Sequence, residues 1–246
     1  MDTVILKAFE SIRCGFLDVF FGIFTALGEE TIIAGIIAVI YMCFDKNLGE
    51  RALITVLTAS CATTGVKGAV RRLRPYEAGV VGKVQIDNAF VSTADLDADM
   101  SFPSGHATAT SGFFSCIAIR KRKAPVIVLS SVFTLLVMLS RLYLGVHYPT
   151  DVLAGLAVGV GFAFFWHFIY TGFYDARLYV YLGIGLLSMV FLAFDRTATE
   201  SMFQICALTT ATAIGLIIEE KLLESVLSVS VVSEGTPKYG NISDNI

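Results

Sequence analysis

Charged residues are scarce in this chain of 246 residues. Asp, Glu, Lys and Arg make up 16% of it, whereas a soluble globular domain carries about 25%. The hydrophobic share is 55%, the mean hydropathy is +0.73, and the apolar residues come in long runs rather than in amphipathic stripes. This composition excludes an ordinary soluble protein and predicts an integral membrane protein. We expect the lipid bilayer as a partner and no nucleic acid.

Paired cysteines and an export signal are also missing. The five cysteines lie inside apolar runs and none forms a CxxC pair. We therefore interpret them as small core residues rather than as disulfide or metal-binding residues. The N-terminus lacks the basic, apolar and small-residue order of a cleavable signal peptide, so none is expected.

Eight segments are candidate membrane helices, since a spanning helix needs about 20 mostly apolar residues. They cover residues 12–27, 30–44, 50–70, 104–119, 124–143, 149–171, 177–194 and 199–218. Arg13 and Asp18 interrupt the first segment, which could instead lie in the membrane interface. In that case the count drops to seven and the N-terminus changes sides. The expected fold is all-α, a polytopic membrane helical bundle.

A short basic loop predicts the orientation of these spans. The four cations from Arg120 to Lys123 lie between two spans, which places this loop on the cytoplasmic side. Alternation then places the 71–103 loop and the 144–148 turn on the opposite side. With eight spans, both termini are cytoplasmic. The 71–103 loop also carries cations, which conflict with the charge rule and need another explanation.

The first polar cluster is "KGAVRRLRP", from Lys67 to Pro75. Lys67, Arg71 and Arg74 have helical i, i+4, i+7 spacing, which predicts one shared helix face before Pro75 stops the helix. Cations at a span end often extend to the lipid headgroups. We favour that interpretation for Arg71 and Arg72, and a functional one for Lys67 and Arg74.

The second cluster is "PSGH", from Pro103 to His106. Pro103 fits the first turn of a helix because its missing N–H is not needed there. Ser104, Gly105 and His106 then present backbone N–H groups at the positive end of the helix dipole, which favours anion binding. The cluster alone is weak evidence, since a capped helix with an incidental histidine is common.

The third cluster contains Arg141, His147 and Asp151. If the chain is already helical at His147, Asp151 at i+4 can accept a hydrogen bond from one imidazole nitrogen and leave the other free to attack. The predicted topology brings all three clusters to one membrane face. Cations on the unexpected side are explained if they bind phosphate. The third histidine, His167, is expected at the membrane interface near the other end of its span.

Together these residues resemble the signature of the type-2 phosphatidic-acid phosphatase superfamily. The matching pattern is Lys67-x6-Arg74-Pro75, then Pro103-Ser104-Gly105-His106, then Ser140-Arg141-x5-His147-x3-Asp151. The resemblance covers residues 1–172, which are expected to form the phosphatase core with six apolar segments. Residues 173–221 hold two additional spans, and residues 222–246 are expected to form a polar, poorly ordered C-terminal tail.

The resemblance implies a phosphohydrolase that acts on lipid phosphates without a metal or other cofactor. It implies that His147 is the nucleophile, that Asp151 orients it, and that His106 is the general acid. The residues implied to hold the phosphate oxygens are Lys67, Arg74, Ser104, Gly105 and Arg141. We expect a bacterial cytoplasmic-membrane enzyme with an extracytoplasmic site. Undecaprenyl diphosphate and phosphatidylglycerol phosphate are the favoured substrates.

Two other functions are weighed against the same sequence features. A phosphotransferase would pass the phosphoryl group to another lipid or sugar, and a transporter would hold its polar groups near the middle of the membrane instead. Asp95, Asp97 and Asp99 resemble a metal-binding run, but we expect a solvated loop. As a hypothesis, Glu29 and Glu30 influence headgroup choice from the same membrane face.

Overall fold

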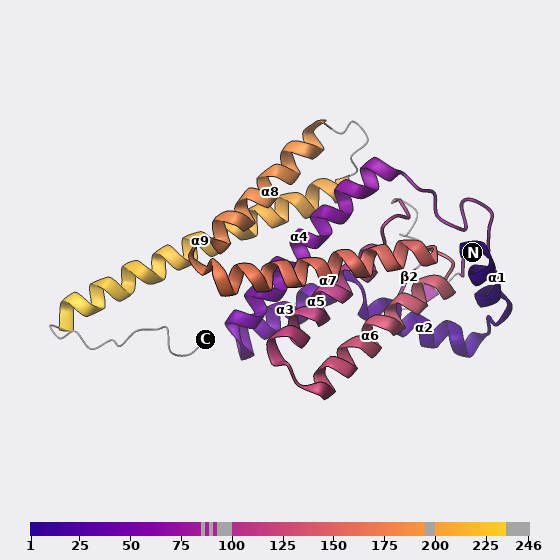
Figure 1. The fold of residues 1–246 in the computed structure, drawn as a ribbon, viewed down its shortest axis with the longest axis horizontal. Helices are drawn as coiled ribbons and strands as arrows, with labels where there is room; N and C mark the ends of the chain where they lie inside the picture. Colours follow the sequence, from indigo (N-terminus) through magenta and orange to yellow (C-terminus); the bar gives the residue numbers. More distant parts are fainter. Residues whose placement is uncertain (85–86, 89–90, 93–99, 195–199, 235–246) are drawn as a thin grey trace.

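The protein is a bundle of helices (Figure 1). The computed structural model describes residues 1–84, 87–88, 91–92, 100–194 and 200–234. In chain order the helices are α1 (Asp2–Ser11), α2 (Gly15–Leu27), α3 (Glu30–Val39), the π-helix η1 (Ile40–Phe44), α4 (Lys46–Val70), α5 (Gly105–Lys121), α6 (Ala124–Tyr143), α7 (Pro149–Gly172), the 3-10 helix η3 (Tyr174–Ala176), α8 (Arg177–Phe194) and α9 (Glu200–Glu234). A short hairpin of two-residue strands, β1 (Asp87–Asn88) and β2 (Val91–Ser92), lies between α4 and α5. The predicted all-α bundle is confirmed, and α5 to α8 lie within two residues of the predicted segments.

The first two predicted spans form one bent crossing, so the count of eight is wrong. The α2 helix and the continuous α3–η1 run form a bent pair that is apolar enough for one span, with an angle of 53° between its parts. Asp18 of α2 accepts a 2.6 Å hydrogen bond from Tyr143 at the end of α6. Asp45, just after η1, lies 3.9 Å from Lys121 at the other end of the bundle. The pair therefore runs from one end of the bundle to the other.

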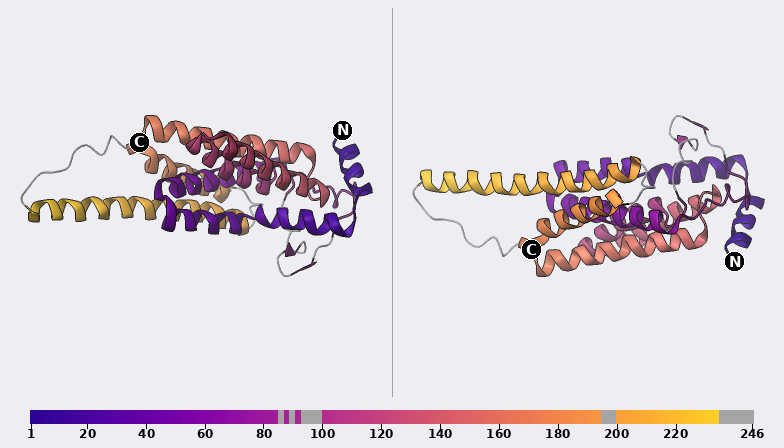
Figure 2. Two further views of the ribbon diagram at one scale, coloured as in Figure 1. Left: turned by 90° about the horizontal axis from the view of Figure 1, so that it is seen from below. Right: turned by 90° about the horizontal axis from the view of Figure 1, so that it is seen from above.

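The N-terminus lies at the same end of the bundle as the start of α7. Helix α1 lies across this end, roughly at right angles to the long helices (Figure 2). Asp2 accepts hydrogen bonds from Thr150 at 2.7 Å and from Arg72 at 3.1 Å. The prediction of an N-terminus beside the basic 120–123 loop is therefore wrong. Because the predicted spans 12–27 and 30–44 form one crossing, the chain crosses the membrane one time fewer before α4, and the N-terminus lies on the other side.

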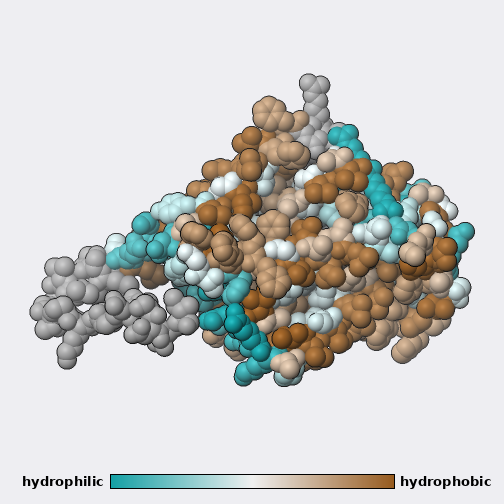
Figure 3. Space-filling model, in the orientation of Figure 1, coloured by the Kyte–Doolittle hydropathy of each residue, from teal (hydrophilic) through white to brown (hydrophobic). Residues whose placement is uncertain are grey.

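The long helices present an apolar surface between more polar ends. Helices α4, α6, α7, η3–α8 and α9 each contain a stretch long and apolar enough to cross a membrane. Hydrophobic side chains cover the middle of the face in Figure 3, while hydrophilic ones gather towards its ends. Helix α9 continues to Glu234 and extends beyond the other helices (Figure 2). It therefore runs through the first part of the segment expected to be a tail.

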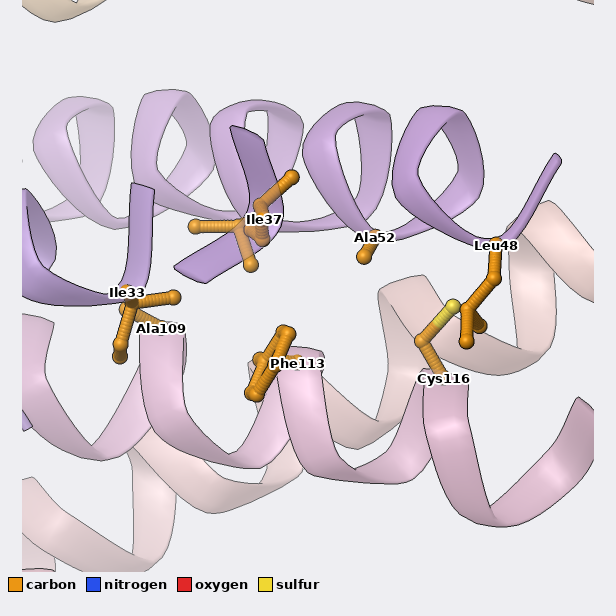
Figure 4. Close-up of a cluster of buried hydrophobic side chains, with 8 residues drawn as sticks. Ile33, Ile37, Leu48, Ala52, Ala109, Phe113 and Cys116 are labelled. Atoms are coloured by element: carbon orange, nitrogen blue, oxygen red, sulfur yellow. The ribbon is translucent and has the colours of Figure 1, made fainter. Parts of the chain in front are cut away.

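Helix α5 lies inside the bundle and positions the second polar cluster. On one side it packs on α3 and α4, where Ile33 lies beside Ala109, and Ile37 and Ala52 face Phe113 (Figure 4). On the other side it lies against Gly159 of α7, where an added Cβ would collide with the Ser111 side chain and the α5 backbone. Small residues allow this close helix approach, which fixes the start of α5 against the start of α7.

Helices α8 and α9 form a hairpin that packs against α4 on the side away from α6 (Figure 1). A buried ion pair fastens this hairpin to the core, since Arg177 Nε lies 3.0 Å from Glu50 Oε1. The same Glu50 oxygen accepts a 2.6 Å hydrogen bond from Tyr170, and Arg177 Nη2 contacts Glu220 of α9 at 3.1 Å. One arginine thus joins α4, α8 and α9.

Replacing Arg177 with methionine should therefore destabilise the protein. Glu50 would lose its buried cationic partner, and breaking a buried ion pair costs about 3–5 kcal/mol. Thermal unfolding in detergent should show a clear fall in Tm. Lys46→Met is the matched control, because it breaks the exposed pair with Glu219, which is worth at most about 1 kcal/mol. Equal Tm values for the two variants would contradict the anchoring role of Arg177.

Candidate active site

The three polar clusters meet at one end of the bundle. The chain before α5 is held by two backbone hydrogen bonds, from Ser101 N to Arg72 O at 2.8 Å and from Ser104 N to Asp151 O at 3.0 Å. These bonds join the segment after α4, the start of α5 and the start of α7. The predicted convergence of the clusters on one face is present in the structure.

His147 lies in the turn between α6 and α7 and is 2% exposed. Gly145 creates this turn, because its φ of +74° is in the left-handed region and a Cβ there would meet Arg13 and Val81. His147 Nδ1 lies 2.8 Å from the carbonyl oxygen of Ser101. A carbonyl can only accept a hydrogen bond, so Nδ1 carries the proton and Nε2 has the free lone pair.

The predicted direct hydrogen bond from Asp151 to His147 is not observed. Asp151 Oδ2 lies 3.7 Å from His147 Nδ1, which is too long for a hydrogen bond. The prediction required a helix at His147, but α7 begins only at Pro149. Asp151 instead accepts hydrogen bonds from Ser101 Oγ at 2.5 Å and from Tyr148 N at 2.8 Å. It therefore contacts His147 indirectly, through the residue whose carbonyl holds the ring.

Arg72 is part of this site and was not predicted to be. Its guanidinium donates a 2.7 Å hydrogen bond to Asp151 Oδ1 and lies 3.7 Å from the centre of the Tyr148 ring. The predicted common face of Lys67, Arg71 and Arg74 is also wrong. Helix α4 ends at Val70, and Arg71 has a left-handed φ of +50° that directs its side chain back to Gly68 O. The chain then turns Arg72 towards α7 rather than towards lipid headgroups.

Three cations surround His147 at the bottom of the site. Lys67, Arg74 and Arg141 are 7%, 4% and 1% exposed. Arg74 Nη1 lies 3.4 Å from the carbonyl oxygen of Val146, next to His147. Arg141 donates a 2.5 Å hydrogen bond to Thr25, and its buried Nε has no hydrogen-bond partner among the described residues.

This environment keeps the His147 ring neutral. Burial, followed by the positive charges of Arg74, Arg141 and Lys67, holds the pKa of His147 well below its usual range. A neutral ring with its proton on Nδ1 leaves Nε2 available as a nucleophile near neutral pH.

The start of α5 forms the rim of the site. Ser104 is the N-cap and lies just before the first helical residue, Gly105, so Pro103 precedes the helix rather than lying in its first turn. A Cβ on Gly105 would lie 3.1 Å from Glu30 Oε1 and 3.9 Å from Lys67 Nζ. The backbone N–H groups of this first turn lack intrahelical acceptors and can bind an anion.

His106 follows on this rim, within the electrostatic range of Arg141 and Lys67. Its Nε2 lies 3.0 Å from Glu29 Oε2. Glu29 lies at the break between α2 and α3, so the bend in this crossing lies beside the site. Both glutamates singled out in the sequence, Glu29 and Glu30, thus border the cluster of cations.

All eight predicted site residues lie in this region, whereas His167 does not. His167 lies 3.4 Å from Arg122 at the opposite end of the bundle. The acidic run Asp95, Asp97 and Asp99 lies outside the described residues, and within the described ranges no group of three His, Cys, Asp or Glu side chains is placed to hold a metal ion. Sequence reasoning missed Ser101 and Thr25, because neither stands out by spacing or charge, and it assigned Arg72 to the lipid headgroups.

A model described as the PAP2 superfamily matches residues 50–175, just over half of the chain, including all three polar clusters. The chain belongs to the PAP2 superfamily. Phosphatidylglycerophosphatase B of Bacillus subtilis (strain 168) is 28% identical over 172 residues, which cover 65% of this chain and 78% of that protein. A lipid A 1-phosphatase of Rhizobium johnstonii is 31% identical over 116 residues, 47% of this chain and 45% of that protein. The chain thus spans less than half the length of that second relative.

Solved structures agree with the family. A crystal structure of a transmembrane PAP2 type phosphatidylglycerolphosphate phosphatase from Bacillus subtilis has a TM-score of 0.52 and 26% identity, covering 68% of this chain and 82% of that one. The crystal structure of Aquifex aeolicus LpxE has a TM-score of 0.55, covers 68% and 94%, and shows the fold alone at 19% identity. The predicted family and integral membrane fold are confirmed.

Proposed function

We propose that this PAP2-type phosphatase hydrolyses a lipid phosphate or diphosphate through a phosphohistidine on His147. The observation that carries the proposal is a neutral, buried histidine with three cations that are almost completely buried around it. The buried Nε of Arg141 has no hydrogen-bond partner among the described residues, and a phosphate oxygen beside it would accept that hydrogen bond.

In the first step, the Nε2 lone pair of His147 attacks phosphorus while the bond from phosphorus to the lipid oxygen breaks. His106 gives its proton to that departing oxygen. Lys67, Arg74 and Arg141 stabilise the negative charge on the three non-bridging oxygens, together with the Ser104 side chain and the N–H of Gly105. Glu29 Oε2, 3.0 Å from His106 Nε2, orients the ring of this histidine.

In the second step, neutral His106 takes a proton from a water molecule that attacks the phosphohistidine. The bond between phosphorus and Nε2 breaks, inorganic phosphate leaves, and His147 regains its lone pair. Asp151 acts through Ser101 in this scheme, because it fixes the carbonyl that holds the Nδ1 proton. Arg72 keeps Asp151 in place.

The site lies at the end of the spans, where a lipid can keep its tails in the bilayer while its phosphate reaches the cations. We favour phosphatidylglycerol phosphate or undecaprenyl diphosphate as substrates. Support comes from the names of phosphatidylglycerophosphatase B and of the undecaprenyl-diphosphatase BcrC of Bacillus subtilis, which is 42% identical over 72 residues, 28% of this chain and 35% of that protein. The basic 120–123 loop at the other end favours an extracytoplasmic site in a bacterial cytoplasmic membrane.

Purified protein should release inorganic phosphate from a panel of lipid phosphates and diphosphates in the presence of EDTA. The panel should pair each lipid with its dephosphorylated product as a control for inhibition. Transfer of the phosphate to an added lipid alcohol, without release to water, would indicate a phosphotransferase. Failure to turn over any member of the panel in detergent and in vesicles would contradict the proposed function.

A further inference from the structure

An apolar groove runs along the outer face of α4, between this helix and α8. Its volume is about 460 Å³, within the range typical of ligand sites. Gly65, Val66 and Ala69 line the α4 side, Leu187 and Phe191 line the α8 side, and Cys206 of α9 contributes to its wall. The α8 wall lies outside residues 50–175, which the family model matches.

The position of the groove indicates a hydrocarbon occupant. Both of its walls belong to helices long and apolar enough to cross a membrane, and its lining includes no charged residue. Within the hydrocarbon core of a bilayer, such a groove has no water to bind and is filled by lipid chains. Gly65 has no side chain, which leaves room between α4 and the ring of Phe191.

The groove adjoins the candidate active site. Lys67 belongs to the same turn of α4 as Val66 and Ala69, but it faces the interior, where it is 7% exposed. Cys61 and Gly65 of the groove wall precede Lys67 on α4, and a Cβ on Gly105 at the phosphate site would lie 3.9 Å from Lys67 Nζ. The apolar groove and the phosphate site therefore lie on opposite sides of the same turns of α4.

We propose that this groove binds the hydrocarbon tail of the lipid phosphate substrate. The proposal rests on the proposed function, and it gives the α8–α9 hairpin a role in substrate binding. A tail that enters the groove leaves lipid rather than water. The favourable free energy of tail binding therefore comes from packing and not from the hydrophobic effect. The groove therefore contributes selectivity for tail shape and length rather than a large affinity.

Gly65→Leu tests the proposal by filling the groove. A Cβ at this position meets only Phe191, at 3.7 Å, so the helix backbone is left undisturbed. The kcat/KM for a long-tailed lipid phosphate should fall roughly tenfold, the scale expected for misfit in an apolar pocket. The kcat/KM for a short-chain, water-soluble analogue with the same headgroup should stay within about twofold. Gly183→Leu on α8 is the matched control, since its Cβ would meet nothing within 4 Å.

Equal losses on the two substrates, or no loss on either, would overturn the tail-binding role. If Gly65→Leu does not fold, Phe191→Ala decides, because it widens the groove and should shift preference towards bulkier tails. The exposed Phe168→Ala on α7 is its control, and an unchanged tail preference in Phe191→Ala would count against the groove. Absence of phosphate release by the unmodified protein would instead reject the proposed function itself.

Discussion

Replacement of His147 by alanine should abolish turnover and the covalent phosphoenzyme together. The nucleophile is lost while the cations remain, so phosphate can still bind but cannot be transferred. We expect phosphate release to fall by on the order of 10⁴-fold or more, as for other enzymes that lose their nucleophile. Rapid quenching with a substrate labelled in its terminal phosphate should give an acid-labile, base-stable label on the unmodified protein and none on the variant.

Folding of the His147→Ala variant needs an independent check. Its Tm in detergent should stay close to that of the unmodified protein, because among the described residues the ring makes a single hydrogen bond, to Ser101 O. Labelled phosphoenzyme that persists in a folded His147→Ala variant would assign the nucleophile to another residue. Direct attack by water would be indicated if the unmodified protein never carries label.

His106→Ala should slow turnover about 10²–10⁴-fold, the usual contribution of a general acid. The loss should depend on the leaving group. A lipid alcohol needs a proton as it departs, whereas an acidic aryl alcohol does not, so an aryl phosphate should lose much less in the first step. Comparing burst and steady-state rates for the two substrates separates formation of the phosphoenzyme from its hydrolysis.

Glu29→Gln and Glu30→Gln are a matched pair of variants that tests the role of His106 as general acid. Glu29 contacts His106 Nε2 at 3.0 Å, so its loss should move the pH dependence of the proton-donating step, and Glu30→Gln should leave that dependence unchanged. A similar loss of the burst rate for the lipid and the aryl phosphate in His106→Ala would contradict a general-acid role. The hypothesis that both glutamates select the headgroup requires a changed substrate preference in the double variant.

The spacing of polar residues predicted the site better than it predicted the contacts within it. The three motifs lie at span ends, and hydropathy locates span ends well. The contacts depend on where each helix stops. Because α4 ends at Val70, the helical phase that placed Arg71 beside Lys67 no longer applies. Because α7 begins at Pro149, Asp151 is not one helical turn below His147. Such ends are decided by local backbone conformation, which residue periodicity does not encode.

The prediction of the membrane topology was wrong for a different reason. Two apolar runs separated by Gly28 and two glutamates have the pattern of two short spans, and only the packing of α2 on α6 and of α3 on α5 shows that they form one path. The role of Ser101 was equally hidden, since any residue type supplies the carbonyl that holds His147, and its hydroxyl meets Asp151 only through a contact between residues far apart in the sequence. Side-chain chemistry could be predicted from the sequence, whereas backbone contributions and bends needed the fold.

The bend between α2 and α3 also decides on which side of the membrane α1 lies. With this pair as one passage, α1 lies beside the candidate active site, and the six helices from α4 to α9 alternate in direction after it. The start of α1 and the end of α9 therefore lie on opposite sides of the membrane. A reporter that works only in the cytosol should function when fused after α9 and fail when fused before α1.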